Sequence, residues 1–252
     1  MHRPLIIANW KSNPLTLKEA LDLARGAEEA ARRFRGAEIV VAPPFLFAIE
    51  VSKLLKYAKL GAQDAFWSDG PYTGEVSWRQ LKKIGVCYVI LGHSSRRAEL
   101  GETDDVVNKK LKAVLGGGLL PVLCIGEFRR KGNTVPPIVG LQLKKALKGI
   151  KKSQLKNLVI AYEPVWAIST MPGARADTPQ SAERAIKYLR DAISRIYGRK
   201  AAHEIRMLYG GSVSSKNARD FLSHPGIDGA LVGGASLRPQ EFGEIISRAF
   251  KG

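Results

Sequence analysis

Short apolar runs recur along the chain, and most of them end in a polar residue or a glycine. They are Leu5–Asn9, Glu38–Ala42, Leu60–Gln63, Cys87–Gly92, Leu120–Gly126, Leu158–Glu163, Ile205–Gly210 and Gly229–Gly233. A short, continuous apolar run is typical of a strand that is buried on both faces. The pattern therefore predicts eight buried strands.

The stretches between these runs carry signals for helices. Thr16 and Glu19 form a capping box ahead of one helical segment, and Thr178 precedes a proline at the first helical position of another. Thr103 and Ser214 are further N-cap candidates. Strands and helices are thus expected to alternate along the chain.

Such alternation predicts a parallel sheet with right-handed crossovers. Eight units within 252 residues match a single-domain (β/α)8 barrel over residues 1–252. A doubly wound open sheet is the alternative, and it usually carries a glycine-rich turn after its first strand. Here Asn9, Trp10 and Lys11 follow the first strand, and distinctive polar residues follow four others. A site assembled from so many strand ends favours the closed barrel.

Composition limits the location and the redox state of the protein. No apolar segment is long enough to span a bilayer, and the amino terminus lacks a long apolar region ending in a small-residue cleavage site. Cys87 and Cys124 lie within apolar runs, where buried, reduced thiols are the default. We therefore expect a cytoplasmic protein without disulfides.

The formal net charge is +17, with 40 Lys and Arg against 23 Asp and Glu. This excess is compatible with a nucleic-acid partner, with an acidic partner surface or with a solvated basic shell. The cations are spread over helical segments, and no RNA-binding motif accompanies them. We favour the solvated shell over a nucleic-acid partner, and the positive field would also attract an anionic substrate.

Glu163 ends the apolar run that begins at Leu158, and Pro164 follows it directly. The proline biases Glu163 toward an extended backbone and so stiffens its support. A partly desolvated carboxylate at such a place can act as a base near neutral pH. For this residue taken alone, a solvated acid at the end of a strand is the simpler interpretation.

His93 and Lys11 also stand directly after predicted strands. If a short helix begins after His93, its N-terminus disfavours the protonated ring, and a neutral imidazole can donate a hydrogen bond to a carbonyl. Lys11 offers a fixed positive charge to an anionic substrate. Taken singly, the histidine is also compatible with a structural role and the lysine with a surface position.

Paired glycines follow the last two strands, in Gly210-Gly211-Ser212 and Gly233-Gly234. Glycines let backbone N–H groups approach a ligand closely, and barrels of this kind bind phosphate in the loops after strands seven and eight. The four histidines and two cysteines show no metal-ligand spacing, and no nucleotide-binding loop is found. The expected chemistry therefore uses Lys, His and Glu without a metal or cofactor.

In their joint order these motifs resemble the triosephosphate isomerase family over nearly the whole chain. The matching segments are Asn9–Lys11, Gly61–Gln63, Tyr72–Glu75, Gly92–Ser94, Gly101–Asp104, Ala161–Ile168, Tyr209–Ser212 and Val232–Leu237. The resemblance implies interconversion of dihydroxyacetone phosphate and glyceraldehyde 3-phosphate through an enediol or enediolate.

By this resemblance Glu163 moves the proton, His93 polarises the carbonyl and Lys11 stabilises the developing negative charge. The implied substrate-binding residues are Asn9, Lys11, Ser169, Ser212, Gly233 and Gly234. The resemblance also implies a homodimer, in which the loop Ala65–Glu75 inserts beside the neighbouring active site and places Thr73 near the partner's Lys11.

Three places depart from the family's pattern. Ser95 stands where the family has a glutamate that contacts the lysine, and Ser12 stands where methionine is common. In the lid after Trp166, Ser169 and Met171 replace two glycines, and the loop is a few residues longer. Two alternatives therefore stay open: an isomerase of a longer ketose phosphate such as a tetrulose phosphate, and a non-catalytic barrel that binds a phosphorylated ligand.

Overall fold

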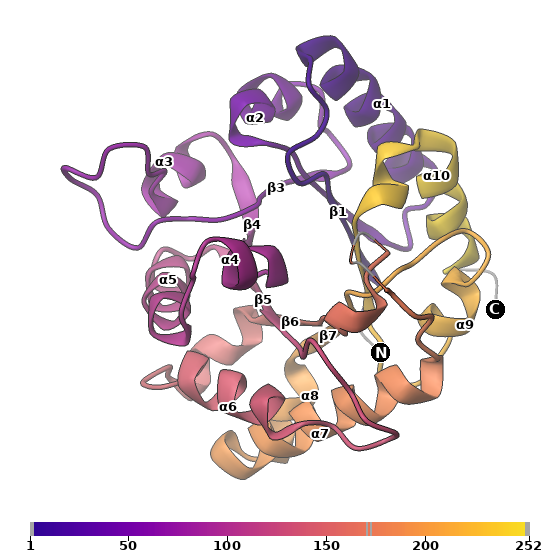
Figure 1. The fold of residues 1–252 in the computed structure, drawn as a ribbon. Helices are drawn as coiled ribbons and strands as arrows, with labels where there is room; N and C mark the ends of the chain where they lie inside the picture. The colour runs from indigo at the N-terminus through magenta and orange to yellow at the C-terminus, as the bar shows by residue number, and fades with distance from the viewer. Residues whose placement is uncertain (1–2, 170, 172, 250–252) are drawn as a thin grey trace.

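The computed structural model describes residues 3–169, 171 and 173–249. Its eight strands pair in chain order, all in parallel, and close into a barrel (Figure 1). The strands are β1 Leu5–Asn9, β2 Glu38–Ala42, β3 Lys59–Ala62, β4 Val86–Leu91, β5 Leu120–Ile125, β6 Val159–Tyr162, β7 Arg206–Tyr209 and β8 Gly229–Val232. Each strand agrees with its predicted run to within one residue at either end, and the predicted (β/α)8 architecture is confirmed.

Helices connect the strands and surround the barrel (Figure 1). The α-helices are α1 Leu17–Arg33, α2 Phe45–Ser52, α3 Trp78–Lys83, α4 Ser94–Glu99, α5 Asp104–Gly116, α6 Pro137–Ala146, α7 Pro179–Tyr197, α8 Arg199–Glu204, α9 Ala218–Leu222 and α10 Pro239–Arg248. Three short 3-10 helices are η1 Lys152–Asn157, η2 Val165–Ala167 and η3 Gly234–Leu237. In α1 all buried residues are alanines, which let the helix lie close to the strands.

Three of the predicted helix starts are confirmed. The Thr16 side chain accepts a hydrogen bond from the Glu19 N–H, and the Glu19 carboxylate accepts one from the Thr16 N–H. These two bonds complete the capping box of α1. Thr103 caps α5 by accepting from the backbone N–H of Val106. Thr178 caps α7 and is followed by proline. These signals are local, so they act as predicted in the folded chain.

The predicted cap at Ser214 is wrong. Helix α9 begins at Ala218, and Asn217 occupies its N-cap position. The Asn217 side chain accepts from the Ser214 N–H at 2.8 Å, so residues 214–217 form a turn instead of a first helical turn. A side chain that bonds to nearby backbone competes with helix formation in this way.

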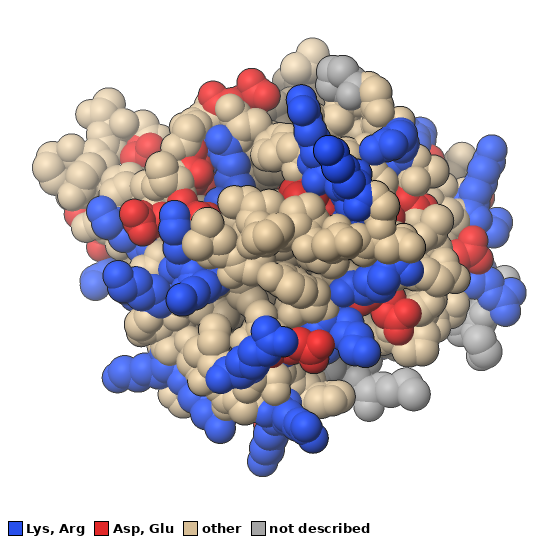
Figure 2. Space-filling model, turned by 60° about the horizontal axis from the view of Figure 1, so that its bottom comes forward, with Lys and Arg blue, Asp and Glu red and all other residues tan. Residues whose placement is uncertain are grey.

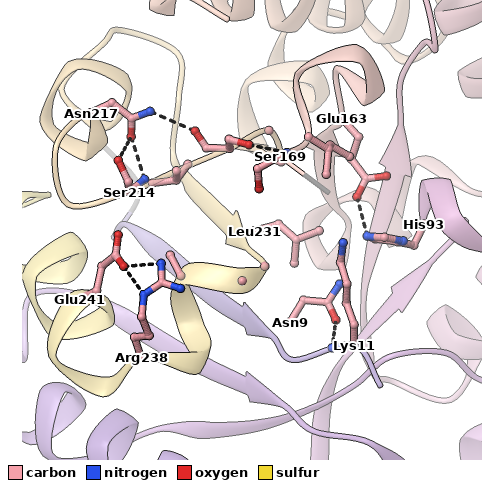
Figure 3. Close-up of a pocket in the computed structure, with 18 residues that line it drawn as sticks. Asn9, Lys11, His93, Glu163, Ser169, Ser214, Asn217, Leu231, Arg238 and Glu241 are labelled. Carbon is pink, nitrogen blue, oxygen red and sulfur yellow. Dashed lines mark hydrogen bonds and ion pairs between the residues drawn. The ribbon is translucent and has the colours of Figure 1, made fainter. Parts of the chain in front are cut away.

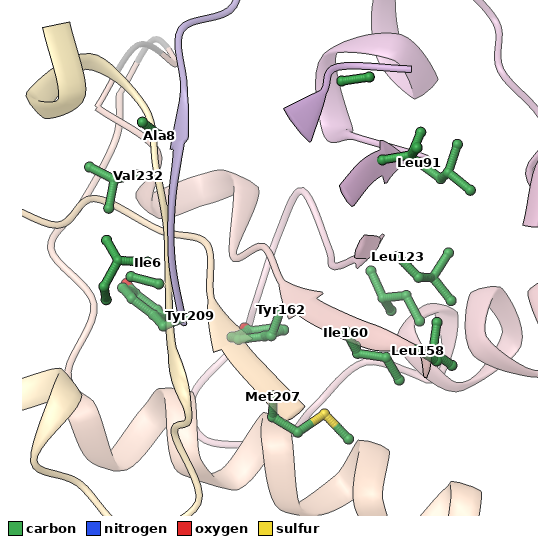
Figure 4. Close-up of a cluster of buried hydrophobic side chains, with 14 of the residues drawn as sticks. Ile6, Ala8, Leu91, Leu123, Leu158, Ile160, Tyr162, Met207, Tyr209 and Val232 are labelled. Atoms are coloured by element: carbon green, nitrogen blue, oxygen red, sulfur yellow. The ribbon is translucent and has the colours of Figure 1, made fainter. Parts of the chain in front are cut away.

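Side chains along each strand alternate between two apolar layers. Leu5 and Ile7 belong to the cluster inside the barrel, whereas Ile6 and Ala8 belong to the layer between strands and helices. Figure 4 shows part of this outer layer. Because both faces of the sheet are covered by apolar side chains, the strands are apolar throughout, and continuous runs could predict them.

A polar cluster closes the amino-terminal end of the barrel. The Glu38 carboxylate accepts hydrogen bonds from Tyr88 at 2.9 Å and from Lys59, and forms an ion pair with Arg206 at 2.6 Å. Burial alone would raise the pKa of Glu38, but the hydrogen bonds from Lys59, Arg206 and Tyr88 lower it to about 2. The cluster therefore keeps Glu38 charged.

The segment between β3 and α3 extends away from the barrel (Figure 1). Within it, Phe66 stacks on Trp67 with ring centroids 3.9 Å apart and packs against Tyr72 at 4.6 Å. Arg79 of α3 forms an ion pair with Asp69 at 3.0 Å. Aromatic packing and an ion pair within one chain thus stabilise this segment.

The described helices include none that is long and apolar enough to cross a bilayer. Cys124 is fully buried inside the barrel, and burial raises the pKa of its thiol well above the ordinary value. Cys87 lies near the start of β4 and is only half-buried. Both thiols are free, so the expectation of a buried, reduced cysteine is met by Cys124 and only in part by Cys87.

Candidate active site

The carboxyl ends of the strands surround a cavity of about 310 Å³ (Figure 3). All eight residues predicted from the sequence line it, although they come from five different strand ends and the lid. They are Asn9, Lys11, His93, Glu163, Ser169, Ser212, Gly233 and Gly234. The barrel therefore brings the ammonium, the imidazole and the carboxylate to one place.

Glu163 follows β6 and is only 2% exposed. Its Oε2 accepts a hydrogen bond from the Ser94 N–H at 2.9 Å, and its Oε1 lies 3.3 Å from His93 Nε2. Its own N–H donates to the carbonyl of Ile125 at 2.8 Å, which extends the pairing of β6 with β5 to the rim. The carboxylate is thus held at two atoms on a rigid support.

Two glycines make room for Glu163. A Cβ atom on Gly126 would lie 1.7 Å from the Glu163 carbonyl oxygen, and a Cβ on Gly210 would lie 2.9 Å from Glu163 Cγ. The first contact is with backbone, which cannot move aside without disturbing the strands. Glycine at these positions lets the ends of β5 and β7 pack directly against the carboxylate's support.

His93 is the N-cap of α4, so a short helix does begin directly after it. Its Nδ1 accepts a hydrogen bond from the Ser95 N–H at 3.2 Å and lies 2.8 Å from the Ser95 hydroxyl. A backbone N–H can only donate, so Nδ1 carries no proton and the proton of the neutral ring is on Nε2. That nitrogen faces Glu163 (Figure 3).

Lys11 has a strained backbone, with a φ of 55°. The Asn9 side chain accepts from the Lys11 N–H at 3.2 Å, and Gln63 donates to the Lys11 carbonyl at 2.7 Å. A Cβ on Gly233 would lie 3.9 Å from Lys11 Nζ, so the ammonium lies beside the paired glycines. No acidic side chain among the described residues forms an ion pair with Lys11, and Ser95 stands where the family has a carboxylate.

The lid contacts the loop after β7. The Ser169 N–H donates to the Ser212 hydroxyl at 2.7 Å, and this hydroxyl donates in turn to the carbonyl of Ala167 at 2.8 Å. The Ser169 amide is therefore directed toward the Ser212 side of the cavity. Positions 170 and 172 of the lid lie outside the described residues.

A buried carboxylate supports the first residues of the lid. Glu127 Oε1 accepts from the Tyr162 hydroxyl at 2.9 Å and from Trp166 Nε1 at 3.0 Å, and it pairs with Arg130 at 2.9 Å. Burial raises the pKa of Glu127, against the opposing effect of these donors. Because Trp166 belongs to η2, the contact fixes the start of the lid to the barrel.

Four polar lining residues were not predicted as part of the site: Ser214, Asn217, Arg238 and Glu241. Asn217 bonds to Ser214, and Arg238 pairs with Glu241 at 2.5 Å (Figure 3). They lie in the loop after β7 and at the start of α10, several residues beyond the strand ends. No local motif marks them, since their position depends on how the two loops fold back over the cavity.

A second hollow of about 330 Å³ adjoins the same site on the other side of Lys11 and His93. It is lined in addition by Phe45, Leu100 and Ser95. Phe45 and Leu100, which line it, are 39% and 66% exposed. Large apolar side chains thus surround this second opening in the single chain.

The described part of the chain contains no group of three or more His, Cys, Asp or Glu side chains placed to hold a metal ion. A closed parallel barrel with a polar cavity at the carboxyl ends of its strands is the arrangement of a (β/α)8-barrel enzyme. A carboxylate, an imidazole and an ammonium in this cavity form a set suited to proton transfer beside a developing negative charge.

Residues 4–249 match the sequence profile of a family described as triosephosphate isomerase. The triosephosphate isomerase of Thermoanaerobacter pseudethanolicus is 44% identical over 98% of this chain and 100% of its own length. That of Dictyoglomus turgidum is 43% identical over 98% of this chain and 99% of its own length. The chain belongs to the triosephosphate isomerase family, whose enzymes are aldose–ketose isomerases.

Proposed function

We propose that this chain interconverts dihydroxyacetone phosphate and glyceraldehyde 3-phosphate, with Glu163, His93 and Lys11 as its catalytic residues. The observation that supports this most directly is the meeting of the three side chains in one cavity of about 310 Å³. Glu163 removes a proton from the carbon next to the carbonyl and returns it to the neighbouring carbon. No other reactant is needed, because the two sugars are isomers.

In this proposal His93 donates its Nε2 proton in a hydrogen bond to the substrate oxygens. Lys11 stabilises the negative charge of the enediolate and of the phosphate, and its lack of an acidic partner leaves its full charge to the ligand. Glu163 must turn from the Ser94 N–H toward the substrate carbon. Its low exposure supports the proposal, because few water molecules compete for its carboxylate.

The phosphate is bound at the far end of the cavity by Ser212 and by the backbone N–H groups of Gly233 and Gly234. Asn9 contributes to substrate binding by accepting a hydrogen bond from the Lys11 N–H, which helps to hold Lys11 in place. The Ser169 amide joins these donors when the ligand is bound. For this it exchanges its hydrogen bond with the Ser212 hydroxyl for one with a phosphate oxygen.

The test is an isomerase assay of the wild type beside Glu163→Asp and Lys11→Ala. Each substitution should lower kcat/KM at least about a hundredfold, since one displaces the base and the other removes an oriented charge. Glu204→Asp and Lys156→Ala, both at exposed positions on the outer helices, serve as matched controls and should retain activity. Equal rates in all five proteins would exclude the proposed roles.

The same assay with a four-carbon ketose phosphate decides between the two substrate classes. The three-carbon substrate should have the higher kcat/KM. A higher kcat/KM for the four-carbon sugar would mean that the longer lid accommodates a larger substrate. No activity on either sugar would favour a non-catalytic barrel that binds a phosphorylated ligand.

The proposed enzyme is a homodimer. The second hollow beside Lys11 and His93 is open in the single chain, and its lining residues Phe45 and Leu100 are exposed. Insertion of the protruding loop Ala65–Glu75 into the hollow of a second copy would cover these apolar side chains. Thr73 would then lie near the partner's Lys11, and each site would be completed by its neighbour.

A further inference from the structure

Six cations gather around the turn that joins α6 to η1, at the amino-terminal end of the barrel. We call this set the basic face, and its members are Lys112, Lys148, Lys151, Lys152, Arg199 and Lys200. All six residues are exposed. Because η1 and α8 directly precede β6 and β7, the basic face lies at the opposite end of the barrel from the cavity.

Contacts between the elements place these cations together. The Tyr197 hydroxyl lies within hydrogen-bond distance of the carbonyls of Leu147 at 3.1 Å and Ile150 at 3.0 Å, which fastens the end of α7 to the turn. A Cβ on Gly149 would lie 3.2 Å from Lys112 Nζ, and one on Gly198 would lie 3.8 Å from Lys152 Nζ. Residues far apart in the sequence thus form one surface.

This surface lacks compensating charge. The segment 144–162, which runs from the end of α6 through η1 and β6, holds six cations and no Asp or Glu, and the cations are Lys144, Lys145, Lys148, Lys151, Lys152 and Lys156. None of the six members of the basic face forms an ion pair with an acidic side chain of the described chain. Figure 2 turns the side of α6, α7 and α8 toward the viewer, and Lys and Arg dominate its lower part.

The stability of the helices accounts for only part of this arrangement. A helix dipole favours cations in the last turn, and Lys144 and Lys145 occupy that position in α6. Arg199 and Lys200, however, begin α8, and Lys152 begins η1. At a helix start the dipole disfavours a cation. Arg199 and Lys200 also directly follow the C-cap of α7, where the dipole of that longer helix favours cations, but Lys152 has no such support and the cations repel one another.

The sequence favours a solvated shell over a nucleic-acid partner, but the gathering of these cations on one surface changes that expectation. We propose that the basic face binds the phosphate backbone of a nucleic acid without reading its sequence. Lysines without an ion-pair partner among the described residues supply point charges for phosphates. This electrostatic attraction dominates the free energy of non-specific binding. Phosphate contacts of this kind need no aromatic platform for bases. The isomerase cavity stays open, since it lies at the other end of the barrel.

The proposal is tested by the binding of a fluorescein-labelled DNA duplex to the full-length protein, followed by fluorescence anisotropy. The wild type should bind at about 50 mM salt and lose affinity steeply toward about 200 mM, with a log–log slope no steeper than about −5 for six contacts. The triple variant K148E/K151E/K152E should bind at least tenfold more weakly.

The matched control is K18E/K56E/K83E, which reverses three exposed lysines on the side of α1 to α3. Both triple variants lower the net charge by six, from +17 to +11. Only the first should lose DNA binding, and both should keep the isomerase rate of the wild type. If both triple variants weakened DNA binding equally, net charge alone would explain the binding, and the basic face would not be a binding site. Binding of phosphatidylglycerol vesicles without binding of DNA would assign the face to a membrane and also overturn the proposal.

Discussion

Ser95 holds the His93 ring in the tautomer that carries its proton on Nε2, the nitrogen that faces Glu163. Its N–H donates to Nδ1, and its hydroxyl lies at the shorter distance of 2.8 Å from the same atom. Because the N–H already makes Nδ1 an acceptor, the hydroxyl must donate as well. A residue that replaces a family glutamate thus gives the imidazole a second donor and holds the ring in one tautomer.

Replacing Ser95 with alanine should therefore lower kcat about threefold to tenfold and change KM little, because one hydrogen bond is lost and water replaces it in part. Ser95→Thr, which keeps the hydroxyl, should restore the rate. The side-chain ¹⁵N spectrum of His93 gives an independent measurement: the Nε2–H tautomer should persist in the alanine variant, because the backbone N–H of residue 95 still donates, while the Nδ1 signal should shift because the hydroxyl donor is lost. An unchanged spectrum together with an unchanged kcat would show that the hydroxyl plays no part.

Single residues of the site could be predicted where they directly follow a strand. Lys11, His93 and Glu163 are of this kind, since the carboxyl ends of parallel strands meet at one end of the barrel. Arg238 and Glu241 could not be predicted, because their place in the cavity depends on the path of a loop. The hydrogen bond between the Ser169 N–H and the Ser212 hydroxyl could not be predicted either, because it joins residues 43 positions apart.

At the scale of elements, the strands could be predicted because burial on both faces leaves a continuous apolar signal. The helix starts at Thr16, Thr103 and Thr178 could be predicted because a cap involves only neighbours in sequence. The start of α9 could not, since the side chain of Asn217 competes for the backbone of Ser214. Local signals fail where a second local hydrogen bond opposes them.

The cluster at the amino-terminal end of the barrel was not predictable, because its ion pair joins Glu38 and Arg206, 168 residues apart. It makes a definite prediction for stability. The pKa of Glu38 is lowered from 4.5 to about 2, so the folded state favours the charged carboxylate. Its contribution is fully present above about pH 4.5 and is lost as the pH falls toward 2.

The variant Glu38→Gln should accordingly lower the free energy of unfolding by about 2–3 kcal/mol at neutral pH. The difference from the wild type should shrink as the pH falls through the interval from 4.5 to about 2. Urea unfolding at several pH values measures this difference, with Glu244→Gln, at an exposed position on α10, as the control. A difference that stays constant across this interval would mean that packing, and not the charge, is responsible.

At the scale of the whole molecule, the open hollow and the exposed apolar side chains predict self-association. Light scattering should give a mass about twice the 27.5 kDa of the chain. Leu100→Glu, at a residue that lines the hollow, should shift the protein toward monomers and lower its activity, because a buried unpaired charge would oppose the interface. Ile196→Glu, at an exposed position on α7, is the matched control and should stay dimeric. A wild type that is monomeric at all concentrations would refute the dimer.

The separation between the cavity and the basic face has a practical consequence for orientation. Adsorption to a cation-exchange matrix through Lys148, Lys151 and Lys152 would turn the lid and the mouth of the barrel toward the flowing solution. Sugar phosphates would reach each immobilised molecule without crossing the support. The basic face would thus orient the enzyme on the matrix with its active site exposed to the substrate.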